Sequence, residues 1–299
     1  MVDEQTFIKA LAKQFKVKRK DVLLGIGDDG AVLTNGLVLS CDTQVEGVHF
    51  KRAWITPYNL GRRAVAVTTS DIAAMGGVPS FLLLSLGIPK HEEQIYMNQL
   101  MKGVRLACEN YRLSLIGGNL TRAKELFIDC FILGKTKGVP VARKGALAGD
   151  VILLTGTLGK QSEARMKGKL LVPKARVEEG IIARKGGATA MIDVSDGLAK
   201  DVHSICDASD VGACIFADKL PRPSSVPIDL ALSGGEDCEL CFTAPPTKAG
   251  AIASSIKSKT GTDVSVIGEI LPKRKGRWLR DKNGKEVALR PEGWDHFSR

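Results

Sequence analysis

Acidic residues recur along the chain at glycine-rich turns and at the ends of predicted strands. They are Asp28 and Asp29, Asp42, Asp71, Asp193 and Asp196, and Glu236 and Asp237. Taken singly, they have structural explanations: Asp71 and Asp196 stand where they would cap a helix N-terminus, and Asp28-Asp29 and Glu236-Asp237 suit tight turns. Most of them also follow an apolar stretch, however. We therefore expect these carboxylates to gather at sheet edges, where loops meet.

A cluster of carboxylates indicates a bound divalent cation. Carboxylates repel one another strongly at low dielectric, and a hard cation such as Mg²⁺ relieves that repulsion. Zinc is a poor candidate, because His49, His91, His203 and His296 are not paired at ligand spacing. The 43 Lys and Arg against 33 Asp and Glu give a net charge of +10, which favours an anionic partner. Mg²⁺ held by acids inside a basic protein would suit a polyphosphate.

Three short segments imitate known motifs, and their contexts argue against all three. Gly25–Gly30 matches GxGxxG, but a strand and turn follow it rather than the helix that would hold a pyrophosphate. Gly156–Gln161 resembles a P-loop, but its first glycine lies too close and Gln161 replaces the metal-binding hydroxyl residue. Cys238 and Cys241 form a lone CxxC without a second pair, so we expect packed, reduced thiols.

The elements that must position the acids form two predicted α+β domains, residues 1–138 and 139–299, without strict βα alternation. The first is expected to contain helices over 4–15, 58–67 and 92–111 and strands over 36–41, 81–87, 113–116 and 126–133. The second is expected to contain strands over 151–154, 189–194, 239–243 and 264–270 and helices over 174–184, 198–206 and 247–259.

A series of motifs resembles the thiamine-monophosphate kinase family. In chain order they are Gly25–Asp29, Asp42-Thr43 with Gly47–Phe50, Ser70–Gly76, Gly117-Gly118 with Thr121-Arg122, Ile192–Leu198, Ser233–Asp237 and Gly293–Phe297. The resemblance covers nearly the whole chain. It implies an aminoimidazole-ribotide-synthetase-like fold and a homodimer joined through N-terminal sheets. It also implies Mg²⁺-dependent phosphoryl transfer from ATP to thiamine phosphate, giving thiamine diphosphate.

The resemblance further implies roles for individual residues. The metal ligands for several Mg²⁺ ions would be Asp29, Ser40, Cys41, Asp42, Asp71, Asn119, Asp193 and Asp196, with Asp42, Asp71 and Asp196 central to catalysis. Tyr111, Gly118, Asn119, Arg143 and Ser195 would contact ATP, and His49, Glu236 and Trp294 would contact thiamine phosphate. Two positions depart from the family pattern: Asn119 replaces a metal-binding Asp, and Cys41 replaces a Thr. These departures bear on the metal count more than on the reaction.

Two alternatives stay open from the sequence. Other ATP-using enzymes share the fold, and aminoimidazole ribotide synthetase is the closest, although the Gly293–Phe297 ending disfavours it. The other class is a nucleic-acid binder, because Lys273–Lys285 is a basic run around Trp278. Such runs are more often solvated surface, so nucleic acid is the weaker alternative. The apolar stretches fall far short of the ~20 residues of a membrane span, and no signal peptide precedes them, so we expect a cytoplasmic protein.

Overall fold

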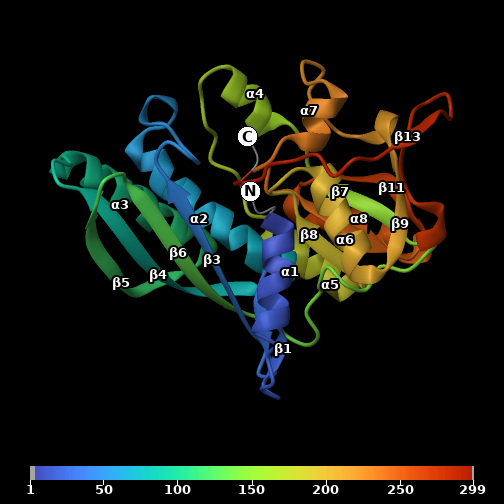
Figure 1. Ribbon diagram of the computed structural model, residues 1–299, viewed down its shortest axis with the longest axis horizontal. Helices are drawn as coiled ribbons and strands as arrows, with labels where there is room; N and C mark the ends of the chain where they lie inside the picture. The colour runs from blue at the N-terminus through green and yellow to red at the C-terminus, as the bar shows by residue number, and fades with distance from the viewer. Residues whose placement is uncertain (1–3, 298–299) are drawn as a thin grey trace.

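The computed structural model describes residues 4–297 and contains two separate β-sheets (Figure 1). The six-stranded sheet has the order β1-β2-β3-β6-β4-β5, and the seven-stranded sheet has the order β13-β12-β9-β11-β7-β10-β8. The first sheet comes entirely from residues before 136 and the second from residues after 150. The mixed α+β class expected from the sequence is confirmed. No helix in the described part of the chain is both long and apolar enough to cross a membrane.

The first sheet carries two of its three helices on one face. Its strands are β1 (Val22–Leu24), β2 (Ala31–Leu33), β3 (Leu37–Val45), β4 (Val78–Pro89), β5 (Ser114–Ala123) and β6 (Phe127–Lys135). The helices of this part are α1 (Glu4–Gln14), α2 (Pro57–Ala74) and α3 (Gln94–Tyr111). Buried side chains of α2 and α3 pack with those of β4 and β6, and Leu60, Leu82, Leu100 and Ile132 are fully enclosed. Strand β5 lies at the edge and is almost wholly exposed.

The second sheet is covered by helices on both faces. Its strands are β7 (Val151–Thr155), β8 (Ala190–Asp193), β9 (Val211–Phe216), β10 (Leu240–Ala244), β11 (Val264–Pro272), β12 (Arg277–Arg280) and β13 (Glu286–Ala288). Its helices are α4 (Lys160–Met166), α5 (Val177–Gly186), α6 (Leu198–Ser209), α7 (Ile228–Ser233) and α8 (Pro246–Thr260). Alternate residues of β7 face opposite sides: Ile152 and Leu154 pack towards α6, whereas Leu153 packs towards α5 and α8. These central strands are therefore buried on both faces.

Helix α2 connects the two halves. It ends at Ala74, so the helix end expected near residue 67 is wrong. Thr56 accepts a hydrogen bond from the amide of Asn59 and caps its start, and Pro57 occupies the first turn. The hydroxyls of Thr68 and Thr69 bond back to carbonyls one turn earlier, so this polar run stays helical. The helix ends only before Gly76, whose φ is +64°. Its last turn packs against α5.

Neither aspartate that was expected to cap a helix does so. Asp71 lies inside the last turn of α2 rather than at a helix start, so the capping explanation is wrong for it. Helix α6 begins at Leu198 with Gly197 as its N-cap residue, and Asp196 precedes that position. The amide of Gly197 instead donates to Asp201 Oδ2 at 3.1 Å. The carboxylates of Asp71 and Asp196 are thus free of the structural role that their sequence context suggested.

Candidate active site

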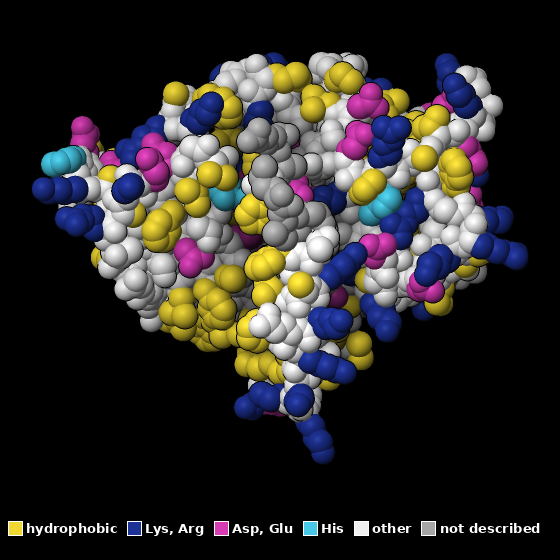
Figure 2. Space-filling view, in the orientation of Figure 1, with side chains coloured by type: hydrophobic (Ala, Val, Ile, Leu, Met, Phe, Trp, Pro, Cys, Tyr) yellow, Lys and Arg dark blue, Asp and Glu magenta, His cyan; other side chains and the backbone are white. Residues whose placement is uncertain are grey.

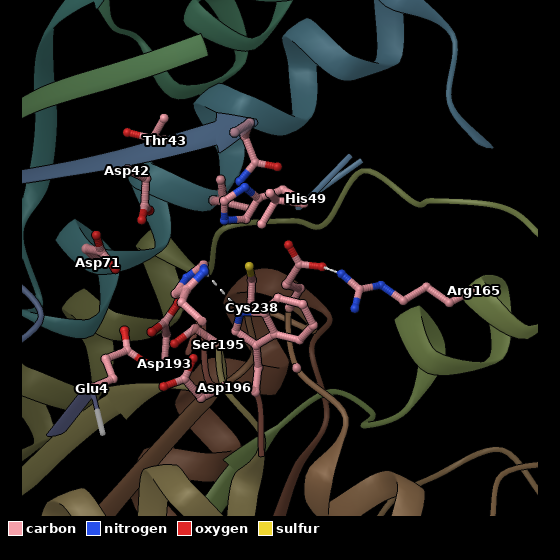
Figure 3. Close-up of a pocket in the computed structure, with 17 residues that line it drawn as sticks. Glu4, Asp42, Thr43, His49, Asp71, Arg165, Asp193, Ser195, Asp196 and Cys238 are labelled. Atoms are coloured by element: carbon pink, nitrogen blue, oxygen red, sulfur yellow. Dashed lines mark hydrogen bonds and ion pairs between the residues drawn. The ribbon is translucent and has the colours of Figure 1, made fainter. Parts of the chain in front are cut away.

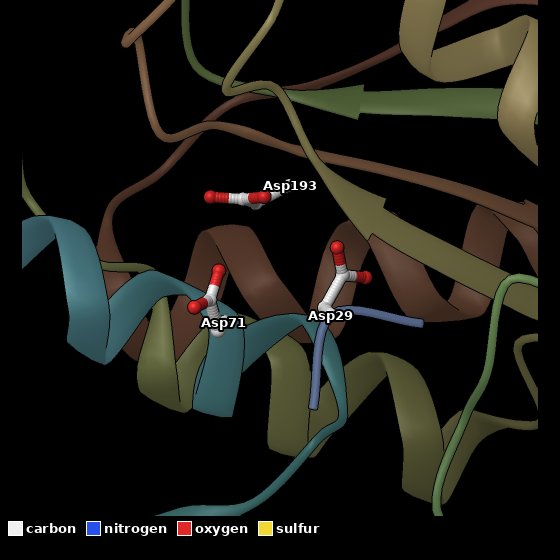
Figure 4. A group of neighbouring side chains, drawn as sticks. All are labelled: Asp29, Asp71 and Asp193. Atoms are coloured by element: carbon white, nitrogen blue, oxygen red, sulfur yellow. The ribbon is translucent and has the colours of Figure 1, made fainter. Parts of the chain in front are cut away.

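Three carboxylates from distant parts of the chain meet between the two sheets. Asp29 comes from the loop before β2, Asp71 from the last turn of α2 and Asp193 from the end of β8 (Figure 4). One oxygen from each lies within 4.8 Å of the other two. Asp29 Oδ2 and Asp193 Oδ1 are buried and accept no hydrogen bond from the described residues. Buried, unsatisfied carboxylate oxygens at this spacing fit a hard divalent cation.

Burial and mutual repulsion hold protons on this cluster when no cation balances it. Burial, followed by the charge of neighbouring acids, raises the pKa of Asp42 to about 7 and that of Asp193 to about 7. The pKa of Asp71 rises well above its ordinary value for the same reasons. The pKa of Asp29 also rises, because burial outweighs the favourable charge of Arg143. A cation in this cluster would therefore displace protons.

Strand β3 presents two of the predicted ligands to the cluster and turns the third away. Ser40 and Asp42 lie on the same face of the strand, and the Ser40 hydroxyl donates to Asp71 Oδ2. Cys41 lies between them, so its side chain points to the opposite face, where it is exposed. The Cys41 thiol is thus separated from the carboxylates, and only its main chain runs beside them.

A cavity of about 220 Å³ extends from the acidic cluster to a basic corner (Figure 3). In Figure 3, Asp42, Asp71, Asp193 and Asp196 occupy one side and Arg165 the other. The three residues expected to contact thiamine phosphate, His49, Glu236 and Trp294, all line this cavity. Ser195 lines it as well. The fold therefore brings the three predicted substrate residues and four of the eight predicted metal ligands into one cavity.

Two arginines that the sequence reasoning missed hold Glu236 in place. Arg63 is completely buried on α2, and its Nη2 lies 2.5 Å from Glu236 Oε1. It also donates to the carbonyl oxygen of Leu171 at 2.8 Å. Arg165 of α4 pairs with the other carboxylate oxygen of Glu236. A signal existed for Arg63, since a charge inside the apolar run of α2 needs a buried partner.

His49 and Trp294 form one wall of the cavity. Burial, with a smaller effect of His296, lowers the pKa of His49 to about 4, so its ring is neutral. His49 Nδ1 accepts from the amide of Val45 at 3.0 Å, which leaves Nε2–H as the donor. The Trp294 amide donates to the Asp196 carbonyl at 2.8 Å, and its indole is 40% exposed. The His296 ring lies 5.1 Å from that of His49 and 5.7 Å from that of Trp294.

The glycine-rich loop before β2 borders a second, larger hollow on the other side of Asp29. This hollow, of about 830 Å³, is lined by α1, the segment 25–31, Cys41 and Arg143. Arg143 Nη2 lies 2.6 Å from Asp29 Oδ1, and the Arg143 amide donates to Asp28 Oδ2 at 3.2 Å. Strand β2 follows the loop directly, so the rejection of a dinucleotide motif is confirmed. Arg143 and Asp29 form the boundary between this hollow and the carboxylate cluster.

Tyr111, Gly118 and Asn119 lie away from the carboxylates in this chain. Across the first sheet, Asn119 pairs with Ser85, Ser85 with Asp129, and Asp129 with Thr43. Asn119 and Thr43 are thus three inter-strand spacings apart, which corresponds to about 14 Å. The Tyr111 hydroxyl accepts from the amide of Ala175 at 3.0 Å beside the core of the first sheet. Asn119 therefore cannot share a metal ion with Asp42 of the same chain.

The remaining motif-like segments have structural roles. The two oxygens of Asp237 accept from the amides of Gly159 and Gln161, so a carboxylate already occupies the start of α4, where a P-loop would bind phosphate. Cys241 packs in the core, whereas Cys238 is buried against the cavity, and both are free thiols. In the basic run, Lys273 pairs with Asp210, Arg277 with Asp207 and Arg280 with Glu286. These pairs reduce the charge available to a nucleic acid.

Comparisons with known proteins agree with this geometry. The family models for the N-terminal and C-terminal domains of AIR synthase related proteins match residues 27–136 and 147–279. Thiamine-monophosphate kinase of Escherichia coli strain K12 is 35% identical, over 99% of this chain and 98% of its own. Thiamine-monophosphate kinase of Aquifex aeolicus is 33% identical, over 91% of this chain and 92% of its own.

Solved structures give the same grouping. A structure of AaThiL complexed with AMPPCP and TMP has a TM-score of 0.83 at 32% identity, covering 99% of this chain and 97% of its own. The hydrogenase maturation protein HypE of E. coli reaches a TM-score of 0.76 at 19% identity, covering 97% and 98%, which shows a shared fold alone. Near-complete coverage by relatives above 30% identity decides the matter: the chain belongs to the thiamine-monophosphate kinase family.

Proposed function

We propose that this chain transfers the γ-phosphoryl group of ATP to thiamine monophosphate, giving thiamine diphosphate and ADP in a Mg²⁺-dependent reaction. The observation that carries the proposal is the single cavity that joins the carboxylate cluster to Glu236, His49 and Trp294. The names of the relatives, and the complex of one of them with AMPPCP and TMP, support the same substrates.

The carboxylates would hold the metal ions at the phosphates. Asp29, Asp71 and Asp193 form the candidate first site, and Asp42 and Asp196 face the same cavity. Mg²⁺, when bound, would neutralise phosphate charge so that two anionic substrates can approach. Ser40 fixes the rotamer of Asp71 through its hydroxyl, and Arg143 fixes Asp29. An oxygen of the substrate phosphate would attack the γ-phosphorus directly, so no protein nucleophile is required.

The other end of the cavity suits the thiamine moiety. Trp294 offers an aromatic face for the cationic thiazolium or the pyrimidine ring. The two arginines pair with both carboxylate oxygens of Glu236 and hold the carboxylate in one orientation. His49 would contribute a neutral N–H donor. This arrangement leaves the substrate phosphate pointing towards the acidic cluster.

The nucleotide would approach from the side of Arg143 and Ser195. Arg143 already lies at the Asp29 carboxylate, next to the second hollow. We keep Tyr111, Gly118 and Asn119 as predicted ATP contacts, although the same chain does not bring them to this site. We propose that the boundary between the two domains lies at residues 138 and 139, and the connection between β6 and β7 supports this position.

A homodimer through the first sheet is the proposed assembly. Hydrophobic side chains gather over the region around β4 and β6 in Figure 2. Val78 and Phe81 of β4 and Leu115, Ile116 and Leu120 of β5 are each more than 40% exposed. Contiguous apolar surface at a sheet edge is typical of a protein interface. A cytoplasmic location remains a prediction from the sequence.

The test is a product assay with purified protein, ATP, Mg²⁺ and thiamine monophosphate, in which thiamine diphosphate is followed by chromatography. Free thiamine serves as the control substrate. We expect thiamine diphosphate to form from the monophosphate, with little conversion of free thiamine. Efficient phosphorylation of free thiamine, or no reaction with either compound, would contradict the proposal.

A further inference from the structure

A buried lysine beside the carboxylate cluster contacts three separate segments of the chain. Lys200 lies in the first turn of α6 and is only 7% exposed. Its ammonium lies 2.8 Å from the Asp196 carboxylate, 2.5 Å from the carbonyl oxygen of Trp294 and 3.4 Å from Glu4 of α1. Lysine is rarely this buried unless its charge is paired. The contacts join a candidate metal ligand to a candidate substrate residue and to the first helix.

The segment held by Lys200 is the C-terminal strap, defined here as residues 290–297. The strap follows β13 without forming a helix or strand and returns to the middle of the molecule, near the start of α1 (Figure 1). There it places Trp294 and His296 in the cavity wall. The Trp294 amide donates to the Asp196 carbonyl, so the strap and the 195–197 turn are bonded directly as well as through Lys200.

Gly293 gives independent support for this close attachment. A Cβ atom at this position would lie 2.7 Å from the Asp196 carbonyl oxygen and 3.0 Å from Lys200 Cβ. Such distances are shorter than ordinary van der Waals contacts, so only glycine lets the strap lie this close to α6. The position of Trp294 therefore depends on two things. One is the Lys200 ammonium, which bonds the Trp294 carbonyl oxygen, and the other is the absence of a side chain at Gly293.

We propose that Lys200 is the positioning residue for the thiamine phosphate site. Its ammonium holds the Trp294 main chain and the Asp196 carboxylate at a fixed distance from each other. The Trp294 ring and the candidate metal ligand Asp196 can then contact the same substrate molecule. Lys200 acts through Trp294 and has no role in the chemical step. The inference rests on the proposed function for its kinetic consequence, but the attachment of the strap can be measured without it.

The structural experiment uses metal-free protein in which Trp54→Phe and Trp278→Phe leave Trp294 as the only tryptophan of the three. We expect Lys200→Met to increase the quenching of Trp294 fluorescence by acrylamide, because the strap loses its charged anchor. Gly293→Ala should do the same with the ammonium intact, and it carries the test if Lys200→Met does not fold. Lys257→Met is the control for losing an exposed lysine outside the strap: Lys257, on α8, also bonds one carboxylate and one carbonyl. Unchanged quenching in a folded Lys200→Met variant would overturn the proposal. If that variant does not fold, unchanged quenching in Gly293→Ala would overturn it.

The kinetic experiment separates positioning from general destabilisation. Losing a charged hydrogen bond predicts an increase in KM for thiamine monophosphate of about tenfold in Lys200→Met, with KM for ATP within about twofold. Lys200→Arg should restore part of the loss. If Lys200 acts through Trp294, adding Lys200→Met to Trp294→Ala should raise KM little further. Multiplicative effects, or equal increases for both substrates, would contradict the proposal. A wild-type protein that makes no thiamine diphosphate would refute the proposed function and leave the quenching result standing.

Discussion

At the scale of single residues, the proposed metal ligand Asp71 lies inside the last turn of a helix. Asp71→Asn keeps the shape of the side chain and its hydrogen bond from Ser40 but removes the charge. We expect turnover to fall about 100-fold or more, since even outer-shell partners of a metal contribute about 10- to 100-fold. The melting temperature of the metal-free protein should stay the same or rise, because the neutral Asn side chain cannot ionise among the neighbouring acids.

Asp150 provides the matched control for that prediction. It is also buried, but its carboxylate accepts from the Leu147 amide at 3.0 Å and from the Thr189 hydroxyl at 2.6 Å, away from the cluster. Asp150→Asn should lower the free energy of unfolding by about 1–2 kcal/mol while turnover stays nearly normal. Thermal unfolding and the product assay measure both quantities. Equal loss of turnover in the two variants would mean that Asp71 is only structural.

At the same scale, the sequence indicated the residue types of the site better than their partners. Asp29 and Asp193 were recognisable because acids after apolar stretches predict a sheet edge. Asp71 lies in a helix and was recognisable from the family resemblance, and the three carboxylates do meet. Arg165 was not recognisable from the sequence. Arg63 stood out as a charge inside the apolar run of α2, but its partner Glu236 lies far along the chain and no spacing rule connects them. The separation of Asn119 from the cluster depends on strand order, which residue identity alone does not reveal.

At the scale of elements, the contact between α2 and α5 holds Asp71 in place. A Cβ atom at Gly180 of α5 would lie 2.1 Å from the carbonyl oxygen of Ala73 in the last turn of α2. Gly180→Ala should therefore push the two helices apart and lower the free energy of unfolding by about 1–3 kcal/mol. Because Asp71 lies in the same turn as Ala73, turnover should fall as well. Urea unfolding and steady-state kinetics check the two effects.

Gly250→Ala on α8 is the control for that helix contact. No heavy atom outside the local helix lies within 4 Å of the position where its Cβ would stand. Alanine also favours a helix over glycine by about 1 kcal/mol. This variant should therefore be as stable as the wild type or more so, with unchanged turnover. Similar destabilisation by both substitutions would show that the close approach of α5 to α2 is not responsible.

The accuracy of element prediction followed the strength of the local pattern. Helices α3 and α8 and strands β6 and β7 lie close to the expected ranges, since their apolar periodicity is clear. Strand β9 was missed because it is buried on both faces and contains Gly, Ala and Cys, so it neither alternates nor favours a strand locally. Strand β5 continues beyond the expected residue 116 through a glycine-rich, polar segment, because β4 provides its hydrogen-bond partners.

At the scale of the whole molecule, the exposed edge around β5 predicts how two copies associate. Leu120 is 70% exposed in the single chain, so Leu120→Lys should cost little in the stability of one subunit. In a dimer joined through this strand, the same change would bury a charge, so we expect the variant to be monomeric by light scattering. Val287→Lys on β13, at the edge of the other sheet, should leave the assembly unchanged. A monomeric wild type, or a Leu120→Lys variant that stays dimeric, would contradict this interface.

The meeting of acids from both halves makes the stability of the whole molecule depend on pH. The folded-state pKa values of Asp42 and Asp193 lie at about 7, above the ordinary value of 3.8. Between about pH 4 and pH 7 the folded chain thus keeps protons that the unfolded chain has lost, and the free energy of unfolding falls as pH rises. Burial lowers the folded-state pKa of His49 to about 4. Between about pH 4 and pH 6.5 the unfolded chain therefore holds the extra His49 proton, and the contribution of His49 to the free energy of unfolding rises with pH. Asp42 and Asp193 together outweigh His49, whose opposing effect ends above about pH 6.5.

Mg²⁺ should reverse this loss of stability, because it binds the ionised cluster of the folded chain in place of the protons. In the presence of a chelator, we expect the melting temperature to fall between about pH 6 and pH 7.5. Added Mg²⁺ should raise it strongly at about pH 7.5 and weakly at about pH 5.5, where protons compete for the same oxygens. Asp71→Asn should reduce the Mg²⁺ effect, whereas Asp150→Asn should preserve it. Scanning calorimetry at several pH values measures these shifts. A Mg²⁺ effect of equal size at both pH values would mean that the ion binds outside the Asp29, Asp71 and Asp193 cluster.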